Sequence, residues 1–310
     1  MVASSPLPAP PKQRQLGASG IAISSIAWGM WRLAENGRSA GEAAKLVHAA
    51  LNAGITLLDT ADIYGFNGSG GFGDAEALLG EVLAADPGLR RQMVLATKGG
   101  IIPPVPYDSS FEYLTGALDA SLRRLRVEQV DLYQIHRPDI LTHPAELVRF
   151  AEAAHAAGKI RAFGISNFHP AQTRALVRLM EGASLPLSST QPEISPLVIE
   201  PIEDRTLAIA MEHNLTPLAW SPLGGGRLAK PESARDQAVA DALDKVGAAQ
   251  GVSRAVTAYS WLMAHPAGIV PIIGSQQVER IAEAAHAFQV SWTRNDWYAV
   301  LVAARGEPLP

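Results

Sequence analysis

The chain has 310 residues, of which 47% are hydrophobic and 18% charged, and its formal net charge is −4. This composition is that of a globular protein, and the absence of a Lys/Arg-rich stripe argues against a nucleic-acid or anionic-membrane partner. The sequence contains no Cys, which excludes disulfides, thiolate catalysis and Cys-ligated metals. We therefore expect a small-molecule partner.

The first twelve residues, MVASSPLPAPPK, are rich in Pro and lack a continuous apolar stretch. They fit neither a signal peptide nor a membrane span. We expect residues 1–12 to be a flexible tail of a cytoplasmic protein. No Gly/Ser-rich linker divides residues 13–310, so we expect them to form a single domain.

Short apolar runs recur along the rest of the chain, and each is followed by a longer Ala-rich segment with helical periodicity. The helical segments include 40–54, 110–125 and 143–159, the last with Pro144 at its first helical position. The apolar runs predict eight strands, at 23–29, 55–60, 93–98, 130–136, 160–166, 189–194, 216–221 and 268–274.

Eight βα units without a boundary are typical of a closed barrel rather than an open sheet. We therefore predict an α/β fold, a single-domain (β/α)8 TIM barrel. The longest gap between strands, 222–267, holds a Gly-rich loop and two helical stretches. The seventh unit should carry an additional loop or helix.

Ionisable side chains end three consecutive predicted strands. Asp59 ends the second, Lys98 the third and His136 the fourth, and Tyr64 follows in the loop after the second. Catalytic groups of such barrels lie at the C-terminal strand ends, so these four side chains should meet at one mouth. Each alone also suits a structural ion pair or a wall position; the combination indicates an active site.

The four residue types suit the reduction of a carbonyl group, which needs a proton donor beside the oxygen. A free Tyr has a pKa of about 10, and we expect the Lys98 ammonium to lower that of Tyr64. A buried ammonium needs a counter-charge, which Asp59 would supply. A neutral His136 could orient the carbonyl oxygen.

Six motifs, in order, resemble the aldo-keto reductase superfamily: DTADIYG (59–65), TKGG (97–100), QIHRPD (134–139), GISNF (164–168), AWSPLGGGRL (219–228) and PIIGSQQVERI (271–281). GMWR (29–32) and SPLGGGRL further resemble a bacterial oxidoreductase subgroup. The resemblance implies NADPH-dependent reduction of an aldehyde or ketone to an alcohol. It makes Tyr64 the proton donor, tuned by Lys98 and Asp59, with His136 orienting the carbonyl.

The resemblance also implies a nicotinamide site. Ser166, Asn167 and Gln191 would hold the carboxamide, Trp220 would stack on the ring, and a loop after the seventh strand would cover the pyrophosphate. Since an Arg fork suits a 2′-phosphate, Arg280 favours NADPH, with NADH as the second choice. The whole set is Gly29, Met30, Trp31, Asp59, Ser166, Asn167, Gln191, Trp220, Ser221, Pro222, Leu223, Gly225, Gly226, Arg227, Ile273, Gly274, Ser275, Gln277, Arg280 and Glu283.

We expect the pocket for the carbonyl substrate to include Trp31, Tyr64, Phe66 and His136. No metal site is expected, because the eight His include no H-E-x-x-H motif. A monomer is the default, because no heptad repeat argues for assembly.

Two other functions stay open. The same barrel could belong to a lyase or aldolase in which Lys98 forms a Schiff base, which borohydride would trap. It could also belong to an NADP(H)-binding regulatory or sensing protein, which would bind NADPH tightly without turnover.

Overall fold

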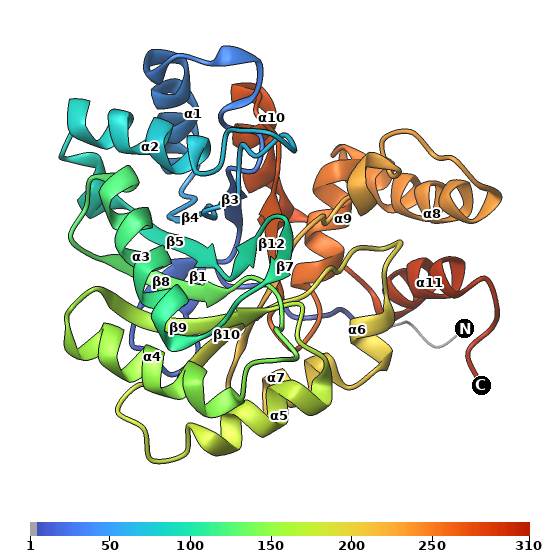
Figure 1. Ribbon diagram of the computed structural model, residues 1–310. Coiled ribbons are helices and arrows are strands. Elements are labelled where there is room, and N and C mark those ends of the chain that lie inside the picture. Colours follow the sequence, from blue (N-terminus) through green and yellow to red (C-terminus); the bar gives the residue numbers. More distant parts are fainter. Residues whose placement is uncertain (1–4) are drawn as a thin grey trace.

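A computed structural model describes residues 5–310, and its centre is a closed barrel of parallel strands (Figure 1). The strands follow chain order around the barrel, and the last pairs with the first to close it. This confirms the predicted (β/α)8 fold. The barrel strands are β3 Ala27–Gly29, β4 Leu57–Asp59, β5 Val94–Gly99, β8 Val130–Ile135, β9 Ile160–Ser166, β10 Leu187–Gln191, β11 Thr216–Ala219 and β12 Val270–Ile273.

Helices surround the barrel and include the three predicted above (Figure 1). Ser110 and His143 cap the second and third of these, each accepting a hydrogen bond from a backbone N–H of the first turn. The α-helices are α1 Ala40–Asn52, α2 Asp74–Ala85, α3 Phe111–Leu125, α4 Pro144–Ala156, α5 Pro170–Leu179, α6 Glu200–Glu203, α7 Thr206–Glu212, α8 Ala234–Gln250, α9 Arg254–Met263, α10 Val278–Glu283 and α11 Arg294–Arg305. Short 3-10 helices are η1 Glu35–Gly37, η2 Leu89–Gln92, η3 Gly224–Gly226 and η4 Ala284–Gln289.

The alternation of side chains along the strands divides the apolar core into two parts. Small and branched residues such as Ala96, Leu132 and Ala162 fill the inside of the barrel. Larger residues such as Tyr133 and Phe163 point outward and pack against the helices. Successive residues of β5, β8 and β9 therefore face either the barrel interior or the helical layer.

One predicted strand, 23–29, is wrong in its extent, because the structure divides it in two. β2 (Ala22–Ser24) pairs antiparallel with β1 (Gln13–Gln15), and the barrel strand β3 begins only at Ala27. The Ser24 hydroxyl donates to the Ile26 carbonyl at 2.6 Å across the bend between them. Leu16 and Ile21 of this hairpin belong to the inner core, so the hairpin closes the N-terminal end of the barrel.

The segment expected to be a flexible tail, 1–12, lies partly outside the described residues, which begin at 5. The remainder contacts the last part of the chain. The Leu7 N–H donates to the Trp292 carbonyl at 2.8 Å, and Pro6 forms a bridge with Thr293. A second hairpin, β6 (Ile101–Ile102) with β7 (Val105–Tyr107), follows β5 at the opposite end of the barrel.

Between residues 5 and 310, no helix combines the length and the apolar character needed to cross a membrane. The same residues contain no cluster of three or more His, Asp or Glu side chains arranged to hold a metal ion.

Candidate active site

The structure brings Asp59, Tyr64, Lys98 and His136 together at the C-terminal ends of β4, β5 and β8. The Lys98 ammonium donates to Asp59 Oδ2 at 2.6 Å, to the Thr60 carbonyl at 2.8 Å and to the Tyr64 hydroxyl at 3.1 Å. The rings of Tyr64 and His136 meet edge to face, with centroids 5.8 Å apart. These contacts form the tetrad expected from the strand ends.

Lys98 and Asp59 are buried, so their charges depend on each other. Burial alone lowers the pKa of Lys98, but Asp59 and Tyr64 raise it by more, and the net direction is upward. Lys98 is therefore a stable ammonium at neutral pH. Its three hydrogen bonds use all of its N–H donors.

Burial also governs the two groups that face the mouth. It raises the pKa of Tyr64, and the lowering by Lys98 offsets this only in part. The expected net lowering of the Tyr64 pKa is therefore wrong, and the phenol stays protonated. Burial, together with Lys98 and Arg137, lowers the pKa of His136 well below its usual value, so its imidazole is neutral as expected.

Gln134 belongs to the site, although the motif analysis gave it no role. Its Nε2 donates to Asp59 Oδ1 at 3.3 Å, and its Oε1 accepts from the Ser189 hydroxyl at 3.3 Å. Gln191 Nε2 donates to the same Asp59 oxygen at 3.0 Å. Because residues two apart on a strand share a face, the position of Gln134 relative to His136 was a usable signal.

The residues expected to hold the nicotinamide carboxamide form one hydrogen-bonded chain. Ser166 Oγ donates to the Gln191 carbonyl at 2.8 Å, and Asn167 Nδ2 donates to the His136 carbonyl at 3.1 Å. Trp220 Nε1 in turn donates to Asn167 Oδ1 at 3.0 Å. Asn167 has a left-handed backbone (φ 61°), a conformation that Asn tolerates.

The remaining expected cofactor residues lie on two segments. Ser221, Pro222, Leu223, Gly225, Gly226 and Arg227 follow β11 and run through η3, whereas Ile273, Gly274, Ser275, Gln277, Arg280 and Glu283 extend from the end of β12 through α10. Two contacts between β3 and the second segment were missed. Trp28 Nε1 donates to the Ser275 carbonyl at 2.9 Å, and Gln276 Nε2 donates to the Gly29 carbonyl at 3.2 Å.

Met30, expected at the cofactor, and Trp31 and Phe66, expected as apolar walls, differ in exposure. Met30 is buried and its N–H donates to the Asp59 carbonyl at 2.9 Å, whereas Trp31 is 62% exposed with the Arg32 guanidinium over its ring. Phe66 is half-buried and its ring meets that of Phe72 edge to face. Trp31 is therefore largely exposed after β3, with one face of its ring contacted by Arg32.

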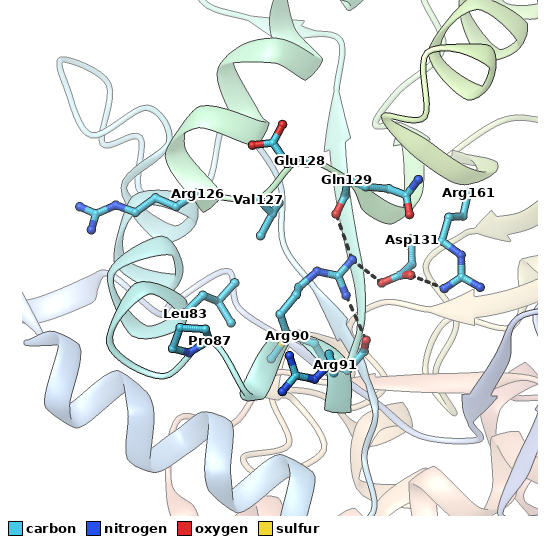
Figure 2. A pocket seen from close by; sticks show the side chains of 11 residues that line it. Leu83, Pro87, Arg90, Arg91, Arg126, Val127, Glu128, Gln129, Asp131 and Arg161 are labelled. Atoms are coloured by element: carbon cyan, nitrogen blue, oxygen red, sulfur yellow. Dashed lines mark hydrogen bonds and ion pairs between the residues drawn. The ribbon is translucent and has the colours of Figure 1, made fainter.

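A pocket of about 550 Å³ lies at the other end of the barrel (Figure 2). Arg90 and Arg161 both contact the Asp131 carboxylate, at 2.9 and 2.7 Å, and that carboxylate also accepts from the Leu95 N–H. None of the tetrad residues lines it. Its charged residues lie at the N-terminal ends of the strands, away from the tetrad.

The sequence model of the Aldo/keto reductase family matches residues 25–301, and the chain belongs to this family. It is therefore an oxidoreductase enzyme with the family's barrel. A "6-dehydroglucose reductase" of Novosphingobium aromaticivorans is 68% identical over 306 residues, covering 99% of this chain and 100% of the relative. An Agrobacterium fabrum protein of the same name is 36% identical over 305 residues, with coverage of 95% and 99%.

The fold also matches a crystal structure of a thermostable aldo-keto reductase, Tm1743, in complex with the inhibitor epalrestat. The TM-score is 0.80 at 23% identity, covering 94% of this chain and 99% of that one. At this identity the likeness concerns the fold.

Proposed function

We propose that this protein uses NADPH to reduce the aldehyde of 6-dehydroglucose, or of a close analogue, to a primary alcohol. The observation that carries the chemistry is the contact of the buried Lys98 ammonium with the Tyr64 hydroxyl at 3.1 Å. The substrate is suggested by the name of a relative, "6-dehydroglucose reductase", which is 68% identical over nearly the whole chain.

Each tetrad residue then has a defined task. When bound, NADPH would supply the hydride for the carbonyl carbon, and Tyr64, which is protonated at neutral pH, would give a proton to the oxygen. The Lys98 ammonium stabilises the phenolate that remains. The neutral His136 ring donates a hydrogen bond that orients the carbonyl, and Asp59 keeps Lys98 charged and in place.

The residues present fit a dinucleotide. Gly225 and Gly226 are exposed, have positive φ and leave open space where a side chain would be, so their backbone can approach a pyrophosphate. The side chain of Trp220 is fixed through its Nε1, so its ring could stack on a nicotinamide. The exposed Arg280 on α10 can reach a 2′-phosphate, which favours NADPH over NADH.

The first experiment is NADPH consumption with 6-dehydroglucose, with Tyr64→Phe as the matched variant and NADH as the second cofactor. We expect Tyr64→Phe to lose about 10²- to 10⁴-fold in kcat while binding NADPH as before. Tight NADPH binding without turnover on a broad aldehyde panel would favour the nucleotide-sensing function. Absence of nucleotide binding would overturn the proposal.

The Schiff-base alternative is disfavoured by the state of Lys98. An amine must be unprotonated to attack a carbonyl, whereas the ion pair with Asp59 and the raised pKa hold Lys98 as an ammonium. Borohydride treatment with substrate should give no covalent adduct. We further predict that the protein is a monomer and acts in the cytoplasm.

A further inference from the structure

A second group of buried polar side chains lies behind the tetrad, on the outer face of β5. Lys98 points into the mouth, so its neighbours Thr97 and Gly99 face the helical layer. Thr97 Oγ1 donates to Glu76 of α2, whose carboxylate also accepts from Arg124 Nε of α3 at 2.8 Å. Most outward positions of the barrel are apolar, so this polar group is unusual for its layer.

Asp62 and Tyr133 stand out within this group. Both are at most 1% exposed. Within residues 5–310, neither the Asp62 carboxyl oxygens nor the Tyr133 hydroxyl has a hydrogen-bond partner of normal geometry. Because leaving a buried polar group without a partner is unfavourable, such a pair requires an explanation.

Gly99 shows how close the two groups are. A Cβ built on Gly99 would overlap the Tyr133 hydroxyl and would lie 3.3 Å from Asp62 Oδ2. The two oxygens are therefore separated by less than two hydrogen-bond lengths, yet no direct hydrogen bond joins them. A buried water is stable where two to four polar groups surround it, and this spacing suits a water that bonds to both.

We propose that Asp62 and Tyr133 hold an internal water molecule beside Gly99, and that this water positions Tyr64 relative to Lys98. Asp62 lies two residues before Tyr64, and its N–H donates to the Lys98 carbonyl at 3.0 Å. Tyr133 is on β8, next to β5 in the barrel. The bridge would thus tie the loop that carries the proton donor to the strand that carries the ammonium.

Because Asp62 interacts electrostatically with Tyr64, the arrangement can be tested through the pH dependence of kcat. Burial and the neighbouring Glu76 raise the pKa of Asp62 well above its usual value. Once ionised at alkaline pH, Asp62 is among the groups that raise the pKa of Tyr64, so replacing it with a neutral amide should lower the pKa of Tyr64. Reduction needs protonated Tyr64, and activity is lost as pH rises through its pKa. The alkaline limb of the kcat profile should therefore move to lower pH. The titratable groups that interact electrostatically with Asp62 are Tyr64, Glu76 from α2, Arg124 and Tyr113 from α3, Lys98 from β5 and Tyr133 from β8.

The test compares Asp62→Asn, Tyr133→Phe and the double variant. We expect each single change to lower kcat about tenfold with the KM for NADPH nearly unchanged. Since both residues hold one water, the double variant should lose no more than the larger single effect. Additive losses, or unchanged kcat and pH profile despite lower Tm, would overturn the positioning role.

Ser25→Ala is the matched control, because Ser25 is another buried hydroxyl without a partner among the described residues, but at the N-terminal end of the barrel. It should leave kcat and the pH profile unchanged. A high-resolution crystal structure should show the water between Asp62 and Tyr133, and an empty position there would reject the proposal. This structural result does not depend on the proposed substrate, so failure of that proposal alone would leave it standing.

Discussion

The Lys98 ammonium lies 2.6 Å from the Asp59 carboxylate, and both side chains are shielded from solvent. Asp59→Asn leaves this buried cation with neutral partners only. We expect a loss of about 3–5 kcal/mol in the free energy of unfolding, measured with urea, and a lower kcat. The control is Asp119→Asn, which removes a partly exposed pair with Lys159 and should cost at most about 1 kcal/mol. Equal losses would contradict this account.

The depressed pKa of His136 predicts a pH effect on stability. The unfolded imidazole binds a proton below about pH 6.5, whereas the buried native ring does not. The free energy of unfolding should therefore fall as pH drops below that value. His136→Gln should flatten the fall, as measured by urea unfolding across pH. His265 has a lowered pKa for the same reason, so His136→Gln/His265→Gln should flatten it further; an unchanged slope would argue against this burial effect.

Two glycines on neighbouring elements should respond in opposite directions to the same substitution. A methyl group at Gly99 would overlap the Tyr133 hydroxyl inside the packed layer, so Gly99→Ala should destabilise by about 1–3 kcal/mol. Gly116, in the interior of α3, has open space, so Gly116→Ala should stabilise by about 0.5–1 kcal/mol. Thermal unfolding of both variants checks the pair, and the same sign for both would refute it.

The choice of cofactor can be tested at Arg280. If this guanidinium binds the 2′-phosphate, Arg280→Gln removes a charge-assisted contact and should raise the Kd for NADPH about tenfold or more. The Kd for NADH should hardly change, since NADH has no such phosphate. Arg294→Gln on α11 is the control with the same change of charge. Calorimetric titration of both nucleotides gives the result, and parallel weakening of both would exclude the assignment.

The barrel and the four tetrad residues could be predicted because they depend on local pattern. Strand periodicity gives the order of the units, and parallel closure places Asp59, Lys98 and His136 at one end. The split of 23–29 was missed. Ser24 and Ser25 interrupt the apolar run where the bend falls, but the bend itself depends on the pairing of residues 13–15 with the first half.

The parts of the site that were missed depend on contacts between distant segments. Trp28 donates a hydrogen bond to the Ser275 carbonyl, although the two residues are far apart in the chain. Nothing in the sequence around either residue indicates this contact. The direction of the Tyr64 pKa was wrong for a related reason. The sequence indicates that Lys98 lies near Tyr64 and lowers its pKa. The larger opposing effect, loss of hydration of the phenol, depends on how completely the folded chain covers it.

The pairing of β3 with β12 has a consequence for synthesis. While residues 270–273 remain inside the ribosome, the growing chain has no partner for the outer edge of either β3 or β11, and both edges can pair with other chains. Likewise, Pro6 and Leu7 can form their contacts with Thr293 and Trp292 only after residues 292–293 have been synthesised. The barrel therefore closes only after β12 has left the ribosome and paired with β3.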